Sequence, residues 1–597
     1  MKTVLALRHG LLPRTLHLDR PTPQVDWTEG AVRLLTAATP WPATGRPRRA
    51  GVSSFGASGT NAHAILEQAP EEPAAEREEY DGPVAWPLSA KSAQALRGQA
   101  AALHAHVLAD PALRPADIGL SLATGRSRFT ERAVVVGSGR AELLDGLGAL
   151  ARGELLADGA TGTAPRGARK AVYVFPGLGA QWPGMATGLL DTSPVFAARV
   201  ADCERAFAPY LDWSLSAVLR GAPGAPALDR VEVLQPALFT VMVSLAAVWR
   251  AHGVEPAAVV GHSQGEVAAA CVAGALTLED AARVAALRSR ALAGVTGGGG
   301  MATLMMSEQE AGRLLAEHAP QVSVAAVNGP RVVVVAGPSA AVRDLVADLS
   351  AQGLMAWNIP VDYASHSGAV DAVRDELRTA LADITPRTPD VPLLSAVDAD
   401  WLTADGITAG YWFRNLREPV RFHAAVRRLL DAGHRTFVEV SPHPTLTYGI
   451  ADTAADAGRD DVRVLGTLRR DEGGRRRLLL ALGEAYTAGL PVDWRPVYEA
   501  TGARRADLPT YAFQRQRYWL DAPAPGGDPA TAGQSDPGHP LLGAAVDLPG
   551  GGTLFTGRLS TATRPWLADH AVAGTVLLPG VAFLEMAAHA GRLLGPA

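Results

Sequence analysis

Cysteine and lysine are scarce in this chain. The two cysteines, Cys203 and Cys271, cannot form a disulfide framework, and no C-x-x-C pair indicates a metal site. Lysine occurs only at Lys2, Lys91 and Lys170, so arginine carries almost all of the positive charge. We attribute this bias to a GC-rich genome rather than to phosphate binding. The composition therefore points to a protein without disulfides or bound metal.

A large excess of one charge is also lacking. The net charge of −5 is small for 597 residues and supports neither a nucleic-acid surface nor an acidic tail. No apolar run reaches about 18 residues without a polar interruption, and the N-terminus has no signal-peptide pattern. We therefore expect a cytoplasmic protein without a membrane span.

The length and composition predict several globular domains, because 48% of the residues are apolar and 19% are charged. A Pro/Glu-rich break at 70–79 and a Pro/Gly-rich stretch at 523–538 divide the chain. Between about 170 and 465, strands alternate with helices. This alternation favours an α/β fold around a largely parallel sheet.

The run Gly261-His262-Ser263-Gln264-Gly265-Glu266 follows an apolar stretch and precedes a helix-forming one. A strand, a G-x-S-x-G turn and a helix predict a nucleophile elbow, which exposes the serine at the carboxyl end of the strand. Amides at the start of such a helix point at an oxyanion that forms beside the serine. Ser263 is our candidate nucleophile, although an ordinary strand-to-helix turn has the same pattern.

Two further residues can complete such a centre. The run Tyr363-Ala364-Ser365-His366 offers His366 as a general base for Ser263. A helix predicted after Thr277 carries Arg288, whose guanidinium can bind a carboxylate through two hydrogen bonds. Each alone has an ordinary explanation, as a structural histidine or a solvated arginine. Together with the elbow they favour covalent acyl transfer.

Five motifs follow one another in the order that is typical of one enzyme family. They are Phe175-Pro176-Gly177-Leu178-Gly179-Ala180-Gln181, Gln235-Pro236-Ala237-Leu238-Phe239, the elbow, Ala326-Val327-Asn328-Gly329-Pro330 and Val440-Ser441-Pro442-His443-Pro444. By these motifs, residues 170–465 resemble the acyltransferase domain of modular type I polyketide synthases. The resemblance implies an α/β-hydrolase-like core with a ferredoxin-like subdomain inserted at about 300–362. It makes Ser263 the acyl-ester nucleophile, His366 its base, and Arg288 the ligand of the extender unit's free carboxylate. Gln181, Gln235 and Asn328 are implied as further pocket residues.

The resemblance also implies an oxyanion hole and a substrate preference. The hole would use the backbone amides of Gln264 and Leu178; the family usually has glutamine in place of Leu178, but a backbone contact should survive the change. Gln264, Tyr363 and Ser365 are the implied specificity residues. Malonyl-selective relatives carry H-A-F-H where this chain has Y-A-S-H, and Ser365 leaves room for an α-methyl group. A methyl-sized difference is worth about 1–3 kcal/mol, so we expect methylmalonyl to be preferred over malonyl.

The flanking segments resemble neighbouring parts of such synthases. Residues 1–70 look like the C-terminal end of a ketosynthase, and 71–169 and 466–525 like the linkers around an acyltransferase, the second with a signature at 511–519. Residues 526–597 look like the start of a hot-dog-fold dehydratase domain, with His570 in the position of its base. The ketosynthase catalytic residues and the acidic partner of His570 have no counterpart in this sequence, so we expect both flanks to be inactive.

The implied reaction moves an extender unit from CoA, through an ester on Ser263, to the phosphopantetheine thiol of an acyl carrier protein supplied in trans. Other synthase modules are the implied partners, and no bound cofactor or metal is needed. Two alternatives stay open. One is a serine hydrolase or editing thioesterase, which would not need Arg288. The other is a non-catalytic product of a truncated gene.

Overall fold

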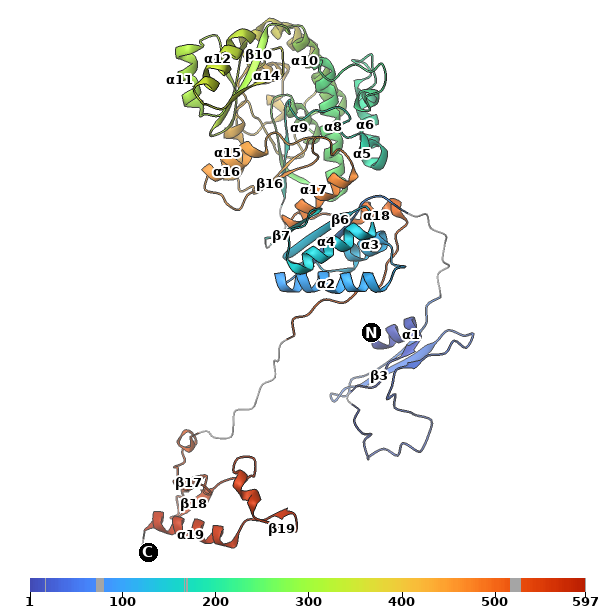
Figure 1. Cartoon of the computed structure of the whole chain (residues 1–597), viewed down its shortest axis with the longest axis vertical. Helices are drawn as coiled ribbons and strands as arrows, with labels where there is room; N and C mark the ends of the chain where they lie inside the picture. The colour runs from blue at the N-terminus through green and yellow to red at the C-terminus, as the bar shows by residue number, and fades with distance from the viewer. Residues whose placement is uncertain (17, 71–79, 166, 168–169, 516–527, 596–597) are drawn as a thin grey trace. The chain divides into compact units, whose positions relative to one another are not determined.

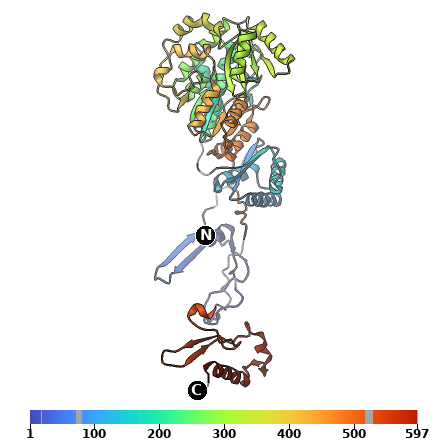
Figure 2. The ribbon, with the colours of Figure 1, turned by 90° about the vertical axis from the view of Figure 1, so that its left-hand side faces the viewer.

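A computed structural model of the chain describes residues 1–16, 18–70, 80–165, 167, 170–515 and 528–595. They form two compact units, Met1–Ala512 and Phe513–Ala597 (Figure 1; Figure 2). Residues 71–79 of the predicted break and 516–519 of the linker signature lie outside the described residues.

A five-stranded parallel sheet with strand order β14-β9-β8-β15-β16 lies in the middle of the first unit. Strand β8 is buried along its whole length, which explains its unbroken apolar sequence. The carboxyl ends of β8 and β9 meet, because Phe175 pairs with Gly261. The predicted α/β class is confirmed. The strands are β8 (Ala171–Phe175), β9 (Pro256–Gly261), β14 (Leu393–Leu394), β15 (Thr436–Glu439) and β16 (Arg463–Gly466).

Both faces of this sheet are covered. Ala171, Tyr173 and Phe175 of β8 pack into one apolar core, whereas Val172 and Val174 pack into another. This alternation follows from the two-residue period of a strand. The helices of this segment are α5 (Thr187–Thr192), α6 (Pro194–Phe207), α7 (Leu215–Leu219), α8 (Val231–Ala251), α9 (Gly265–Val272), α10 (Leu278–Ala293), α13 (Arg374–Ala380), α14 (Ala409–Arg417), α15 (Phe422–Asp431) and α16 (Thr447–Asp456).

Helix α8 is long and apolar enough to cross a membrane by length and composition. The helix is nevertheless not an unbroken apolar run, because it contains the polar residues Gln235, Thr240 and Ser244. Of its most apolar stretch, 89% is buried inside the protein. Such burial is typical of a core helix.

A four-stranded antiparallel sheet is inserted between α10 and the segment that carries His366. Its elements follow the order strand, helix, strand, strand, helix, strand, which is that of the predicted ferredoxin-like subdomain. The chain enters and leaves this subdomain at neighbouring points, because the amides of Gly297 and Gly299 donate to the backbone oxygen of Asp362 at 2.8 and 3.2 Å. The elements are β10 (Gly299–Leu304), α11 (Glu308–His318), β11 (Ser323–Gly329), β12 (Val332–Pro338), α12 (Ser339–Ala351) and β13 (Ala356–Ile359).

Segments from before and after the parallel sheet fold together (Figure 1). Helix α17 packs on strands β6 and β7, far from it in sequence. Arg132 Nη1 donates to the backbone oxygen of Tyr486 at 2.8 Å, and the Arg132 guanidinium lies 4.7 Å from the centre of the Tyr486 ring. The elements are β5 (Val84–Ala90), α2 (Ala93–Ala109), α3 (Pro115–Gly125), β6 (Glu131–Gly137), α4 (Arg140–Arg152), β7 (Gly159–Thr163), α17 (Arg475–Thr487) and α18 (Arg495–Tyr498).

Small sheets and single helices make up the two ends of the chain. The N-terminal part contains α1 (Lys2–His9), the paired short strands β1 (Leu11–Leu12) and β2 (Thr39–Pro40), and the hairpin of β3 (Arg49–Phe55) and β4 (Asn61–Glu67). The described residues of the second unit include two strand pairs and an α-helix: β17 (Ala544–Asp547), β18 (Thr553–Thr556), β19 (Ala571–Val572), β20 (Thr575–Val576) and α19 (Gly580–Leu594).

The turn between β9 and α9 packs against backbone with no space for side chains at its glycines. A Cβ atom on Gly265 would lie 2.2 Å from the Phe175 oxygen and 2.4 Å from the Pro176 oxygen. A Cβ atom on Gly261 would lie 2.1 Å from the Glu266 Cα. Because these neighbours are backbone atoms, they cannot rotate aside, and packing requires glycine at both positions.

We expect Gly265→Ala to lower the free energy of unfolding of the first unit by about 1–3 kcal/mol, because the added methyl group forces α9 away from β8. Gly312→Ala is the control: it lies within α11 with no atom within 4 Å of the added Cβ, so alanine should stabilise by about 0.5–1 kcal/mol. Urea unfolding followed by tryptophan fluorescence measures both. Unchanged stability of Gly265→Ala would contradict the packing argument.

Candidate active site

Ser263 occupies the turn between β9 and α9 in a strained backbone conformation. Its φ of 54° lies in the left-handed region, which serine rarely adopts. The tightly packed glycines on either side hold the turn in this form. The residue lines a cleft of about 690 Å³. Backbone strain held by packing at a cleft is typical of a functional position.

His366 meets Ser263 and is held from behind by backbone. Its Nε2 lies 2.8 Å from Ser263 Oγ. Its Nδ1 lies 2.8 Å from the Glu418 backbone oxygen, which can only accept, so Nδ1 carries the proton and Nε2 is free to take one from the serine. The His366 amide also donates to the Leu416 oxygen at 2.9 Å. A backbone carbonyl thus orients the imidazole as a carboxylate does in a Ser-His-Asp triad.

Arg288 reaches the same serine oxygen from α10, which begins after the capping residue Thr277 as predicted. Its Nη2 donates to Ser263 Oγ at 3.2 Å, and its Nη1 donates to Gln235 Oε1 at 3.0 Å. The residue is only 1% exposed, and its buried Nε has no partner among the described residues. Both of its hydrogen-bond partners are neutral, so the guanidinium is suited to an incoming anion.

Burial sets the charge states of the two residues that contact the serine. Burial, assisted by the nearby Arg288 cation, lowers the pKa of His366 to about 3. The imidazole is therefore neutral at physiological pH and available as a base. Burial also lowers the pKa of Arg288 to about 10, which leaves the guanidinium charged at neutral pH. A neutral base and a cation thus meet at one hydroxyl group.

The two predicted specificity residues before His366 differ in their access to the cleft. Ser365 lines it, and its hydroxyl donates to Met301 Sδ at 3.5 Å. Tyr363 is 4% exposed, and its buried hydroxyl has no partner within the described chain. Burial raises the pKa of that hydroxyl. Ser365 is therefore placed to meet a substituent in the cleft, whereas Tyr363 packs into the main core.

The turn after β8 lies against the elbow. A Cβ atom on Gly177 would lie 3.2 Å from the His262 oxygen and 3.7 Å from Ser263 Cβ. The backbone amides of Leu178 and Gln264 donate to no other residue that the structure describes, and Leu178 lines the cleft. The Gln264 side chain donates back to the Gly177 oxygen at 3.5 Å. This arrangement leaves both amides available for the predicted oxyanion hole.

The other predicted pocket residues act around the cleft. Asn328 lines it, and Asn328 Oδ1 lies 2.8 Å from His262 Nε2. Gln181 Oε1 accepts from the Gly179 amide at 2.7 Å and so braces the turn after β8. Gln235 is the partner of the buried guanidinium. Of these three, only Asn328 is among the lining residues that the structure describes.

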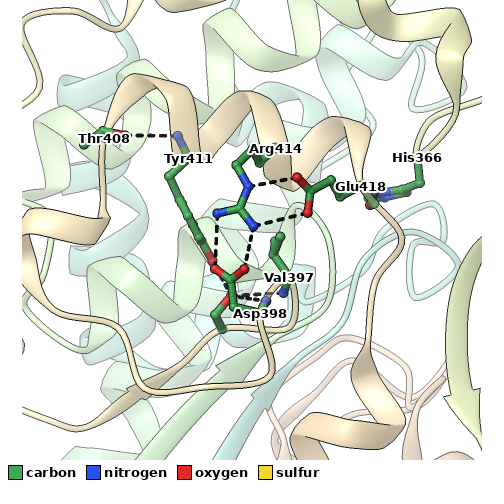
Figure 3. Close-up of polar contacts among 8 residues, drawn as sticks. His366, Val397, Asp398, Thr408, Tyr411, Arg414 and Glu418 are labelled. Atoms are coloured by element: carbon green, nitrogen blue, oxygen red, sulfur yellow. Dashed lines mark hydrogen bonds and ion pairs between the residues drawn. The ribbon is translucent and has the colours of Figure 1, made fainter.

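We did not predict a role for α14 or for Glu418, the residue that follows it, although both reacting groups depend on them. Figure 3 shows Glu418 beside His366. Asn415 Nδ2 donates to the Ser263 backbone oxygen at 3.3 Å and to Glu266 Oε2 at 3.1 Å. The Tyr411 hydroxyl donates to Oε1 of the same buried carboxylate. A backbone acceptor such as the Glu418 oxygen has no side-chain signature, so only Glu266, inside the elbow motif, could have indicated this support.

The cleft walls are mostly apolar and carry little charge. The inserted subdomain contributes one wall, with Met301, Met305, Val334, Trp357 and Ile359. Among the described residues that line the cleft, Arg470 alone has a permanent charge. Mostly apolar walls with a few polar groups are typical of a cleft that binds a small molecule.

His570 lies in the second compact unit. Its ring is exposed, and its Nδ1 lies 2.8 Å from the Leu577 backbone oxygen. In the part of the chain that the structure describes, no carboxylate bonds to this ring. The predicted lack of dehydratase activity stays a prediction.

Three families match the chain: "acyl transferase domain" over residues 172–492, "polyketide synthase dehydratase domain" over 539–597 and "ketoacyl-synthetase C-terminal extension" over 21–136. Polyketide synthase GfsE of Streptomyces halstedii is 54% identical over 608 residues; the alignment covers 100% of this chain and 16% of that synthase. The acyltransferase domain from module 8 of the salinomycin polyketide synthase is 50% identical with a TM-score of 0.67, covering 69% of this chain and 98% of its own. A loading acyltransferase from the avermectin modular polyketide synthase is 48% identical with a TM-score of 0.51, and the match covers 53% of this chain and 99% of that chain.

The low pKa of His366 predicts that Ser263 stays reactive in acid. Labelling by a fluorophosphonate requires a neutral base, so its rate should change less than about twofold between pH 8 and pH 5. A histidine with the ordinary pKa of about 6.5 would lose about 30-fold over the same range. Intact-mass spectrometry measures the rate, with His366→Ala as the control that should label poorly at every pH. A midpoint near pH 6.5 would contradict the buried neutral imidazole.

Proposed function

Since the chain belongs to the modular type I polyketide synthases through its acyl transferase domain, we propose that it transfers an extender unit from coenzyme A to an acyl carrier protein. One observation carries the proposal: His366 Nε2 and Arg288 Nη2 both contact Ser263 Oγ, at 2.8 and 3.2 Å. The first contact provides a nucleophile and the second a receptor for a substrate anion.

In the first half-reaction, Ser263 Oγ attacks the thioester carbonyl while His366 Nε2 takes the hydroxyl proton. The amides of Gln264 and Leu178 stabilise the oxyanion, and the Glu418 oxygen holds the imidazolium at Nδ1. The C–S bond then breaks, the CoA thiolate takes the proton, and the acyl group stays on the serine as an ester. In the second half-reaction, the phosphopantetheine thiol loses its proton to His366 and attacks this ester. Cleavage of the ester C–O bond returns the proton to Ser263.

Arg288 gives this reaction its substrate class. A malonyl-type unit carries a free carboxylate, and a guanidinium with neutral partners and an unpaired Nε can bind both of its oxygens. Ser365 is small and lines the cleft beside Met301, which supports methylmalonyl as the preferred unit. Arg470 is the charged residue of the cleft wall that is suited to a phosphate of the CoA or carrier-bound arm.

Both alternatives account less well for these contacts. A hydrolase or editing thioesterase has no use for a buried cation beside its nucleophile, so Arg288 favours the acyltransferase. A non-catalytic gene product would not need both His366 and Arg288 within hydrogen-bond distance of Ser263 Oγ.

Arg288→Ala should reduce the acylation of Ser263 by methylmalonyl-CoA at least about 100-fold, because a charge-assisted pair to the carboxylate is lost. Arg290→Ala, on the exposed side of the same helix, is the matched control and should acylate normally. Single-turnover intact-mass measurements give both rates, and Ser263→Ala gives the background acylation without the nucleophile. Unchanged acylation of Arg288→Ala would overturn the carboxylate assignment.

The Ser365→Phe variant should shift selectivity towards malonyl, because the ring fills the space proposed for the α-methyl group. The ratio of methylmalonyl to malonyl acylation should fall by about 5- to 150-fold, the range expected of a methyl-sized difference. Competition between the two CoA thioesters, read by intact mass, measures this ratio. Retained malonyl loading shows that the site is intact, and an unchanged ratio would refute the steric argument.

A further inference from the structure

Arg414 joins two carboxylates near the end of α14 without touching a reacting group (Figure 3). Its Nε donates to Glu418 Oε1 at 2.8 Å, and its Nη2 donates to Glu418 Oε2 at 3.2 Å. On its other side, Nη1 donates to Asp398 Oδ2 at 3.3 Å, and Nη2 also contacts Asp398 Oδ1. A planar guanidinium that makes two hydrogen bonds to each of two carboxylates fixes the position of both partners. We call this set of contacts the fork.

The Glu418 residue held in this way also supplies the acceptor for the base. Its backbone oxygen lies 2.8 Å from His366 Nδ1, and its amide donates to the Arg414 oxygen at 2.7 Å. Glu418 follows the last residue of α14, where the terminal carbonyls have no partner within the helix. The orientation of the carbonyl thus depends on contacts made by the rest of the residue.

The second anchor, Asp398, belongs to a loop that is itself tied to the elbow. The amides of Val397 and Asp398 donate to Ser395 Oγ at 3.0 and 3.1 Å. Ser395 Oγ lies 2.7 Å from the Tyr411 hydroxyl, which donates to the buried Glu266 behind Ser263. Arg414 therefore connects the acceptor of the base to the network that supports the nucleophile.

We propose that Arg414 is a positioning residue that sets the orientation and tautomer of His366 through the Glu418 carbonyl. Its side chain and those of Asp398 and Glu418 are 43%, 41% and 36% exposed, and ion pairs this exposed add little to stability. Without the fork, the carbonyl loses its fixed place and the bond to Nδ1–H weakens. The imidazole then also populates the tautomer with a proton on Nε2, which cannot accept from Ser263.

The test uses fluorophosphonate labelling of Ser263, which needs no acyl donor and so does not depend on the proposed function. Arg414→Gln should label about tenfold more slowly, since a general base is misplaced rather than removed. Arg414→Lys, which keeps the charge but not the fork, should fall between. Arg476→Gln is the matched control, because Arg476 also bridges two carboxylates, at 2.8 Å each, with 36% exposure; it should label at the parent rate.

A double-variant cycle separates positioning from general loosening. Glu418→Gln removes the carboxylate but keeps the carbonyl, so combining it with Arg414→Gln should slow labelling no further than Arg414→Gln alone. With methylmalonyl-CoA, the maximal acylation rate should fall while the half-saturating concentration stays unchanged. The proposal would be overturned if Arg414→Gln labelled at the parent rate, or if Arg476→Gln slowed labelling as much as Arg414→Gln does. It would also be overturned if the effects of the two substitutions in the double variant multiplied. Normal labelling of the parent without acylation would instead defeat the proposed function alone.

Discussion

The contacts at one serine oxygen determine how the rest of this centre is built. Ser263 Oγ is shared by an imidazole that must be neutral and a guanidinium that must be charged. Burial favours the first and opposes the second, because it removes water from both. The protein tolerates the buried cation with a neutral glutamine as partner and leaves Nε unpaired. The guanidinium therefore keeps unused hydrogen-bonding capacity beside Ser263, which the carboxylate of the proposed substrate would fill.

Two supports of different kind hold this arrangement. The elbow is fixed by close packing, since Gly261 and Gly265 leave no space for a side chain. The histidine is fixed by hydrogen bonds to backbone at Leu416 and Glu418. Helix α14 joins the two supports, because Asn415 on the same helix bonds to the serine's own carbonyl and to Glu266. Burial raises the pKa of Glu266 to about 7, so this link contains a carboxyl group that can change charge near neutral pH.

The sequence predicted the parts that carry strong local signals. The turn before α9 was predictable because its glycines reflect packing constraints, whereas the inserted subdomain was expected from the family resemblance. His366 and Arg288 were candidates by residue type, but the family resemblance was needed to assign their roles, since neither is distinguished by its neighbours. Glu418 was not predictable, because it acts through a carbonyl that every residue has. The pairing of Arg132 with Tyr486, across 354 residues, likewise follows from tertiary packing alone.

The neighbouring points at which the chain crosses into the inserted subdomain have an evolutionary consequence. Gly297, Gly299 and Asp362 are joined by hydrogen bonds, so the segment between them starts and finishes at one place. A recombination event with ends at these two points would exchange one whole wall of the cleft, including Met301, Trp357 and Ile359. Ser263, Arg288 and His366 all lie outside the exchanged segment. The fold thus allows Ser263, Arg288 and His366 to be inherited independently of this wall of the cleft.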